Sequence, residues 1–376
     1  MRNCFSLCLA VFILFSCNQP TQRTDALHTI NFNLENNIDL FDMLEVSFIK
    51  LETNDKCLIN RTIRQVESAF GKLFILSGGE GKLFVFDSSG NFIAPIGNIG
   101  AGPQEYIFCS SFSIDYNRNI ISLVDMVQKK VVNYSLINYD FISEHRIVEG
   151  LTCFEYMGND KLLWHNLVAQ NDFAGWSFIT TDFNQKYISK HVKKDFITGY
   201  HTTPLKSIYK IDGDIFAYTG YNSNIYHFIG DSVTKLYKIE FGQFALPSMD
   251  YLEKISRGNV NFLHDLAQSN YVFSFSAIGV RNTLVVDYTV FNTHYIGFYN
   301  KLNDQIFSYS MEDFQKKLNI GKIDRISGVV NNTIAAVLLP FHLVEENVDN
   351  YTKELQRLVD ISKDDDNPIL CLLRFK

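Results

Sequence analysis

The stretch Asn119-Ile-Ile-Ser-Leu-Val124 places a turn-forming polar residue directly before an apolar strand, and this pattern recurs along the chain. Asparagine, aspartate and glycine tolerate the positive φ angles that tight hairpin turns require. Five further stretches have the same form: Gly71–Leu76, Asp160–Trp164, Gly213–Tyr218, Asn282–Val286 and Asn332–Val337. From Lys72 to Thr333 the chain makes five steps of about 52 residues each. This period is typical of the blades of a β-propeller.

Most of these strands are followed by two more strands joined by a polar hairpin. The clearest examples are Leu83–Ile93, Val131–Ile142, Ile179–Ile188 and Ile296–Ile306. Strand and turn in alternation form an antiparallel meander, which cannot bury both of its faces alone. Several meanders packed face to face around an axis bury every sheet and leave only short edges.

The sequence therefore predicts an all-β fold, a six-bladed β-propeller of four-stranded antiparallel blades. An immunoglobulin-like array fits poorly because its unit needs about 100 residues, and a solenoid fits poorly because the spacing is irregular. The early strand Leu44–Leu51 and the last strand Ile369–Phe375 are predicted to share one blade and close the ring, since an open ring would expose strand edges.

Three segments interrupt the strands with helical spacing of apolar residues and predict short helical insertions near blades five and six. They are Met249–Ala267, Asp313–Leu318 and Asn350–Ile361. Insertions on a repeat scaffold often form its binding face, although local stapling of the two blades is an equally good reading.

The first residues predict an export signal. Residues 1–16 contain an apolar run from Cys4 to Phe15 that is too short to span a bilayer stably. Leu14-Phe-Ser-Cys17 resembles the lipobox of bacterial lipoproteins, which implies that Cys17 is lipidated and becomes the new N-terminus. An ordinary cleaved signal with an incidental cysteine is the alternative. The predicted organisation is a signal peptide at 1–16, a lipidated N-terminus and tether at 17–29, and the propeller at 30–376.

A lipidated Cys17 would make the lipid bilayer a partner of this chain and would hold the protein on the cell envelope. The outer membrane is the predicted location. The periplasmic and surface faces both stay open, because the tether carries a single acidic residue, Asp25.

Composition excludes some functions. The formal net charge is −7, which opposes binding to polyphosphate and makes nucleic acid an unlikely partner. Once the signal and Cys17 are set aside, four cysteines remain: Cys57, Cys109, Cys153 and Cys371. None forms a Cys-x-x-Cys pair, and each adjoins apolar residues. They are predicted to be small buried hydrophobes, with disulfides left open by the exported compartment.

No motif for a metal, a cofactor or a catalytic residue is present. The nine histidines lack zinc-site spacing, and Gly-x-Ser-x-Gly is absent. The glycine-rich loop Gly97–Tyr106 lacks the Lys-Ser or Lys-Thr of a nucleotide cradle. Its glycines are predicted to turn the chain between blades. Its last residues, Gln104, Glu105 and Tyr106, are the candidate ligand-binding residues, expected at the mouth of the central channel.

Four places together resemble a bacterial family of six-bladed β-propeller lipoproteins, distantly similar to NHL-repeat propellers. They are the lipobox, Phe48–Thr53, the loop Gly97–Tyr106, which resembles a Gly-x-Gly-x-Gly-Pro-x-Glu-Tyr pattern, and Asp366–Leu370. The resemblance covers nearly the whole mature chain. It implies the fold and export, and it carries no catalytic residues.

The function expected from these observations is a membrane-anchored binding or scaffolding module for a peptide, a protein or a glycan. The alternative is a lyase or hydrolase with its site at the channel mouth. A purely structural role in an envelope complex would require a large apolar patch on the outer rim. Convergent histidine, arginine and acidic groups with shifted pKa values in the channel would favour the enzyme, whereas an apolar funnel would favour binding.

Overall fold

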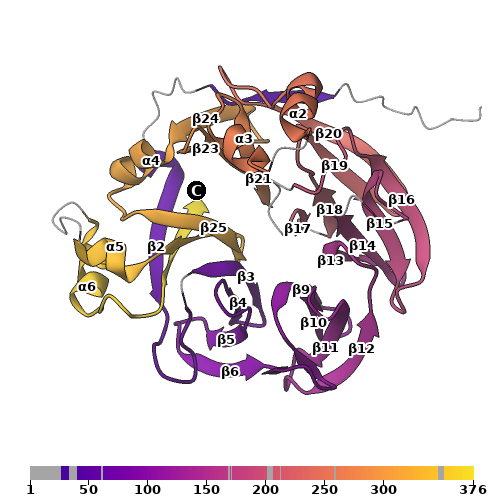
Figure 1. Ribbon diagram of the computed structural model, residues 1–376. Coiled ribbons are helices and arrows are strands. Elements are labelled where there is room, and N and C mark those ends of the chain that lie inside the picture. Colours follow the sequence, from indigo (N-terminus) through magenta and orange to yellow (C-terminus); the bar gives the residue numbers. More distant parts are fainter. Residues whose placement is uncertain are drawn as a thin grey trace, which may run out of the picture.

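The computed structural model shows a closed ring of six blades, each built on four antiparallel strands (Figure 1). It describes residues 27–376 except 34–39, 61, 168–169, 171, 201–205, 212, 258–259 and 346–350. The signal peptide and Cys17 lie outside the described residues. The six-bladed β-propeller predicted from the repeat is confirmed.

Each blade runs from an innermost strand to an outer one, and blades one to three follow the chain in order. Blade one contains β3 (Ile63–Ala69), β4 (Lys72–Ser77), β5 (Leu83–Asp87) and β6 (Phe92–Ile96). The connection to blade two contains the short strands β7 (Asn98–Ile99) and β8 (Glu105–Tyr106). Blade two contains β9 (Cys109–Asp115), β10 (Ile120–Asp125), β11 (Lys130–Ser135) and β12 (Phe141–Arg146). Blade three contains β13 (Leu151–Gly158), β14 (Lys161–Asn166), β15 (Trp176–Asp182) and β16 (Tyr187–Lys193).

Blades four to six include the chain termini. Blade four contains β17 (Ile208–Ile211), β18 (Asp214–Ala217), β19 (Asn224–Ile229) and β20 (Ser232–Glu240), with β1 (His28–Asn31) added at its outer edge. Blade five contains β21 (Val272–Val280), β22 (Thr283–Val290), β23 (Thr293–Asn300) and β24 (Gln305–Ser310). Blade six contains β25 (Ile323–Val330), β26 (Thr333–Leu338), β27 (Ile369–Phe375) and β2 (Leu44–Lys50).

The recurring sequence pattern marks the second strand of every blade, and turn chemistry explains why. In blade six, Asn331 and Asn332 have φ angles of 48° and 60°. In blade three, Asn159 and Asp160 have φ angles of 48° and 60°. Two consecutive residues at positive φ form a turn whose twist matches that of the flanking strands, and Asn and Asp adopt this conformation at low cost.

The ring is closed by the two ends of the propeller, as the sequence predicted. Strand β2 pairs antiparallel with β27, with Leu44 opposite Phe375 and Lys50 opposite Ile369. Strand β25 also pairs in parallel with β3 of blade one, at Gly328 opposite Val66. The last blade is therefore built from both ends of the chain and is bonded to the first blade.

One blade departs from the predicted four antiparallel strands. Strand β1 joins blade four as a fifth strand and lies parallel to β20, with His28 opposite Tyr237. It begins two residues before the boundary expected between tether and propeller. A short, isolated strand carries too little periodicity to be recognised, and its pairing partner lies more than 200 residues away in the sequence.

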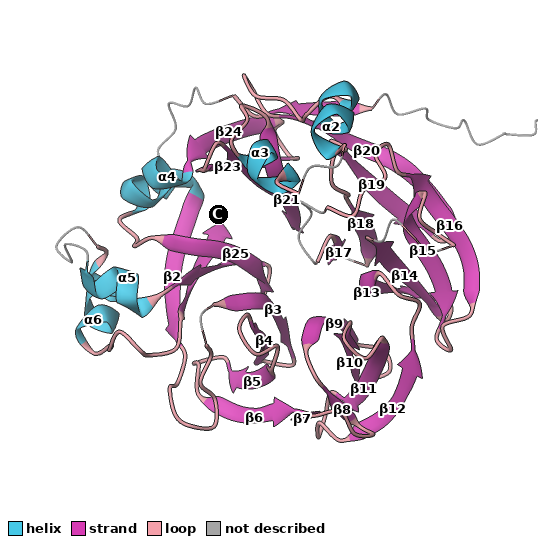
Figure 2. Ribbon diagram, viewed as in Figure 1, coloured by secondary structure: helices cyan, strands magenta, loops and turns pink. Residues whose placement is uncertain are grey.

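The helical insertions lie where the sequence placed them, around blades five and six (Figure 2). The described helices are α1 (Leu40–Met43), α2 (Met249–Ser256), α3 (Phe262–Ala267), α4 (Met311–Leu318), α5 (Pro340–Glu345) and α6 (Lys353–Asp360). Serine or threonine caps start three of them, because the hydroxyls of Ser248, Ser310 and Thr352 accept hydrogen bonds from first-turn amides.

The hydrophobic core consists of clusters between neighbouring blades. Between blades five and six, Phe298 and Phe314 pack with Leu355 of α6 and Cys371 of β27. Cys57, Cys109, Cys153 and Cys371 are all buried and free, which confirms the prediction that they act as small hydrophobes. Burial raises the pKa of the Cys109 and Cys371 thiols, so these thiols stay protonated.

Candidate functional site

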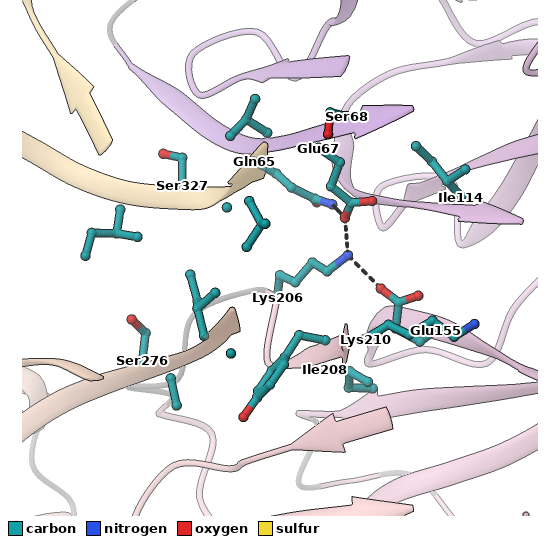
Figure 3. A pocket seen from close by; sticks show the side chains of 18 of the residues that line it. Gln65, Glu67, Ser68, Ile114, Glu155, Lys206, Ile208, Lys210, Ser276 and Ser327 are labelled. Carbon is teal, nitrogen blue, oxygen red and sulfur yellow. Dashed lines mark hydrogen bonds and ion pairs between the residues drawn. The ribbon is translucent and has the colours of Figure 1, made fainter. Parts of the chain in front are cut away.

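A cavity of about 1280 Å³ occupies the centre of the ring. All six blades contribute to its wall, chiefly through their innermost strands β3, β9, β13, β17, β21 and β25. Figure 3 shows side chains from several of these strands pointing toward the same space. Its volume is larger than that of many small-molecule sites.

Charged side chains and small side chains both line the cavity. Glu67, Glu155 and Lys206 come from blades one, three and four, whereas Ser276 and Ser327 come from blades five and six (Figure 3). Small side chains leave room for a ligand in front of blades five and six. The charged groups of blades one, three and four line the same space.

The charged wall is centred on one lysine between two carboxylates. The Lys206 Nζ atom lies 2.5 Å from Glu67 Oε1 and 2.7 Å from Glu155 Oε1. Ser113 donates to Glu155 Oε2 at 3.0 Å, and Gln65 Nε2 donates to Glu67 Oε1 at 2.8 Å. We call Glu67, Glu155 and Lys206 the central triad. It links the first, third and fourth blades across the ring axis.

Electrostatics inside the central triad favour a charged lysine. Burial alone would lower the pKa of Lys206, but the charges of Glu155 and Glu67 outweigh burial and raise it. The pKa of Glu67 is raised, chiefly by burial and further by the charge of Glu155, against the opposing effect of Lys206. The central triad therefore places two carboxylates and one ammonium group together in the cavity wall.

A second polar group lines the cavity at blades five and six. Thr289 and His294 face each other across β22 and β23, with Thr289 Oγ1 and His294 Nδ1 3.3 Å apart. Asp287 lies two residues before Thr289 and therefore on the same face of β22. Burial raises the pKa of Asp287 to about 6, against the opposing effects of His294 and Arg325. This carboxyl group therefore titrates near neutral pH.

The three ligand-binding residues predicted from the sequence do not line this cavity. Tyr106 is buried between blades one and two, where its hydroxyl donates to the carbonyl of Ile96 at 3.0 Å. Figure 2 shows β7 and β8 beside β6 and β12, at the outer side of these blades. The expected position of this loop at the channel mouth is wrong, and a ligand-binding role for its residues stays a prediction.

The loop instead packs neighbouring blades together. Glu105 Oε2 accepts a hydrogen bond from the Gly102 amide at 2.9 Å, and a Cβ on Gly100 would lie 2.0 Å from the same oxygen. Gln104 has a φ of 68°, and its carbonyl accepts from the hydroxyl of Tyr134 in blade two at 2.7 Å. Gly97 has a φ of 66°, and a Cβ there would lie 2.3 Å from the Tyr134 hydroxyl, so this glycine turns the chain between blades one and two, as predicted.

Sequence reasoning missed the residues that do line the cavity. The first strands of blades one, three and four each carry a charged residue that lines the cavity: Glu67, Glu155 and Lys210. Alone, each resembles a solvent-facing position. Only the ring brings them to one space, so no linear spacing reveals them.

Comparison with known proteins agrees with this architecture. A family model described as a 6-bladed beta-propeller, DUF5128, matches residues 18–333. The chain therefore belongs to this family of six-bladed β-propellers. No curated protein matches it.

Solved structures extend the comparison. A Bacteroides fragilis protein named "Putative exported protein" is 31% identical, with a TM-score of 0.88 over 93% of this chain and 99% of that one. A member of the DUF4221 family from Bacteroides vulgatus has a TM-score of 0.55 at 8% identity, over 89% of this chain and 99% of that one, and shows the fold alone. Among the described residues, no helix is both long and apolar enough to cross a membrane.

Proposed function

We propose that this chain is a lipid-anchored protein of the bacterial cell envelope that binds a peptide, a protein segment or a glycan in its central cavity. The observation that carries the proposal is the cavity of about 1280 Å³, whose wall combines the central triad with small residues such as Ser276 and Ser327. Charged and hydrogen-bonding groups that converge on a large concave space favour a polar ligand.

Anchoring rests on the lipobox and on the exported neighbour. Cys17 would carry the lipid, and the chain from there to β1 would act as the tether. The stretch before His28 can span about 35–40 Å when extended, enough to hold the propeller clear of the headgroups. The outer membrane is the proposed location.

Substituting Cys17 with Ala tests the anchor. Lipoprotein acylation needs the thiol, so C17A should lose incorporation of labelled palmitate and leave the membrane fraction. The matched control is Cys8→Ala, which removes a thiol of the proposed signal peptide and should leave labelling intact. Absence of label in the wild-type chain would refute the anchor.

Filling the cavity tests the binding function. The unlipidated chain of residues 18–376 is screened against an array of glycans and a library of short peptides. Ser276→Trp should abolish binding of every ligand found, because the indole occupies space in front of blade five. The control Ile137→Trp places the same side chain on a position that is 68% exposed, on the β11–β12 hairpin. Ligands that bind S276W as tightly as the wild type would contradict a cavity site.

A second function, a lyase or hydrolase, is favoured by one specific observation. Asp287 titrates near pH 6 beside His294, Thr289 and Arg325, and such convergence is the feature expected of an enzyme. A carboxyl group with this pKa can exchange protons near neutral pH. If the ligands found by the screen are turned over, Asp287→Asn should lower kcat by about 100-fold or more. Turnover unchanged in D287N would exclude this role for Asp287.

A further inference from the structure

The three arginines that line the cavity differ in how well their guanidinium groups are satisfied. Arg118 has the most partners: it bonds Asp115 at 2.9 Å, pairs with Asp160 and lies 4.0 Å from the centre of the Phe183 ring. Its donors are directed at protein carboxylates. It therefore needs no further anion.

The other two cavity arginines have far fewer partners. Among the described residues, the Arg64 side chain donates one long hydrogen bond, 3.3 Å to the carbonyl of Gly78. Arg325 makes one contact, 3.4 Å from Nε to Asp324 Oδ2. A guanidinium carries five N–H donors. Both arginines line the cavity, and among the described residues most of their donors have no protein acceptor.

Strand pairing brings Arg64 and Arg325 to the same end of the cavity. Strands β3 and β25 are parallel neighbours, with Val66 opposite Gly328, and the two arginines precede these paired residues by two and three positions. Burial and then the charge of Arg325 lower the pKa of Arg64, which agrees with two cations held near each other. An anion between them would relieve that repulsion.

The pair is also held in place before any ligand arrives. The Arg64 guanidinium lies 4.9 Å from the centre of the Phe108 ring, which supports one face of its plane. The nearby carboxylate of Asp324 already accepts a hydrogen bond from the hydroxyl of Thr62 as well as contacting Arg325. Two neighbouring guanidinium groups can each donate to one oxygen of a carboxylate.

We propose that Arg64 and Arg325 form a subsite for a carboxylate group on the ligand that the central cavity binds. This inference rests on the proposed function and narrows it to acidic ligands. The carboxylate could come from a uronic-acid sugar or from the C-terminus of a peptide.

The first test uses formate as the probe and wild-type protein labelled with 15N at arginine. Formate titration should move the side-chain Nε–Hε resonances of Arg64 and Arg325 and leave those of Arg118 in place. Equal movement of all three resonances, or no movement by 50 mM formate, would overturn the proposal. This arm does not depend on any variant folding.

The second test uses calorimetry to compare the binding of acids with that of their neutral analogues, here called neutral twins. The pairs are galacturonate with galactose and N-acetyl-alanyl-alanine with its C-terminal amide. At least one acid should bind more tightly than its twin, and the pair that responds identifies the source of the carboxylate. Arg64→Met and Arg325→Met should each weaken that acid about tenfold or more, while Arg118→Met should have little effect. Acids that bind no better than their neutral twins would overturn the subsite.

These outcomes separate the subsite from the cavity function. Ligands that lose binding in S276W but not in R64M or R325M would leave the cavity function standing and remove the carboxylate subsite.

Discussion

Asp287 shows how a single buried carboxyl group couples the cavity to pH. Its pKa rises from an ordinary value of 3.8 to about 6, because burial disfavours the charged form. A folded-state pKa above the unfolded value means that the folded chain holds the proton more tightly. The stability contributed by this group is present below about pH 4 and is lost as pH rises through 6.

Asp287→Asn should therefore change the pH dependence of stability. The advantage of D287N over the wild type should grow by about 1–2 kcal/mol between pH 4 and pH 7, since part of the full effect is screened by cavity water. Urea unfolding at several pH values measures it. The control is the exposed Asp364→Asn, which should show a flat difference. An advantage that shrinks as pH rises would contradict the burial argument.

Asn367 is the residue that locks the two ends of the propeller together. It is fully buried, and its Oδ1 accepts from the Ile59 amide at 2.6 Å. Its Nδ2 donates to the carbonyls of Glu52 at 2.6 Å and Cys57 at 2.8 Å. Two of the four places that resemble the propeller lipoprotein family, Phe48–Thr53 and Asp366–Leu370, are thus in direct contact.

Asn367→Ala should destabilise the fold by about 3–5 kcal/mol, because it leaves one amide and two carbonyls buried without partners. Urea denaturation gives the free energy of unfolding. Asn303→Ala serves as the control, since Asn303 is exposed and its side chain, among the residues that the structure describes, bonds Gln305 in its own turn. A loss below 1 kcal/mol in N367A would show that this lock contributes little.

At the scale of elements, the N-terminal strand fastens blade four to blade five. Strand β1 pairs with β20, and the Phe32 amide continues the ladder by donating to the Glu240 carbonyl at 2.9 Å. The Phe32 ring packs over blade five, where a Cβ on Gly297 would lie 2.4 Å from it. The segment that leads from the proposed anchor is thereby integrated into the core.

Phe32→Ala should cost about 3–4 kcal/mol through the cavity it leaves. It should also release β1, which hydrogen exchange of the residues 28–31 amides would detect. Thr29→Ala on the exposed face of the same strand should leave both measurements nearly unchanged. Full protection of β1 in F32A would argue that backbone pairing alone holds the strand.

The helical insertions illustrate the limits of periodicity. Over 249–267 the apolar stripe is carried by two helices, α2 and α3, rather than by one element, and Ser248 caps the first of them. Helix α4 begins two residues before the predicted segment because Ser310 caps it. Spacing locates the buried face, while the caps decide where a helix starts.

At the scale of the whole molecule, the ring survives only if both ends meet. Strand β27 lies between β26 and β2 and fills the cluster between blades five and six with Cys371 and Leu373. Removal of β27 would leave β2 without its pairing partner. It would also open the seam between the last blade and the first.

Deleting residues 369–376 should abolish cooperative unfolding, because the blades lose their closing sheet. Differential scanning calorimetry should show a broad transition of reduced enthalpy. Deleting Lys376 alone retains every strand and should preserve a single sharp peak. An unchanged melting curve in the longer deletion would refute closure as a source of stability.

Local chemistry was sufficient to predict the architecture. Asn, Asp and Gly before apolar runs, such as Asn332 before Thr333–Leu338, predict hairpins from local sequence alone. The period at which these hairpins recur predicts the blades. The pairing of β2 with β27 was also predictable, because a ring without exposed edges has one place for both.

The candidate site could not be read in this way. Glu67, Glu155 and Lys206 come from three different blades and are 88 and 51 residues apart along the chain. Arg64 and Arg325 also come from different blades, the first and the sixth, whose strands β3 and β25 pair with each other. The sequence by itself determined the blades, the order of their strands and the closing pair, because hairpin turns and hydrophobic alternation act between near neighbours. The tertiary structure alone decided which charged groups share the cavity and which loop residues do not reach it. Proximity across the ring depends on how the blades pack around the axis, and no local spacing encodes that geometry.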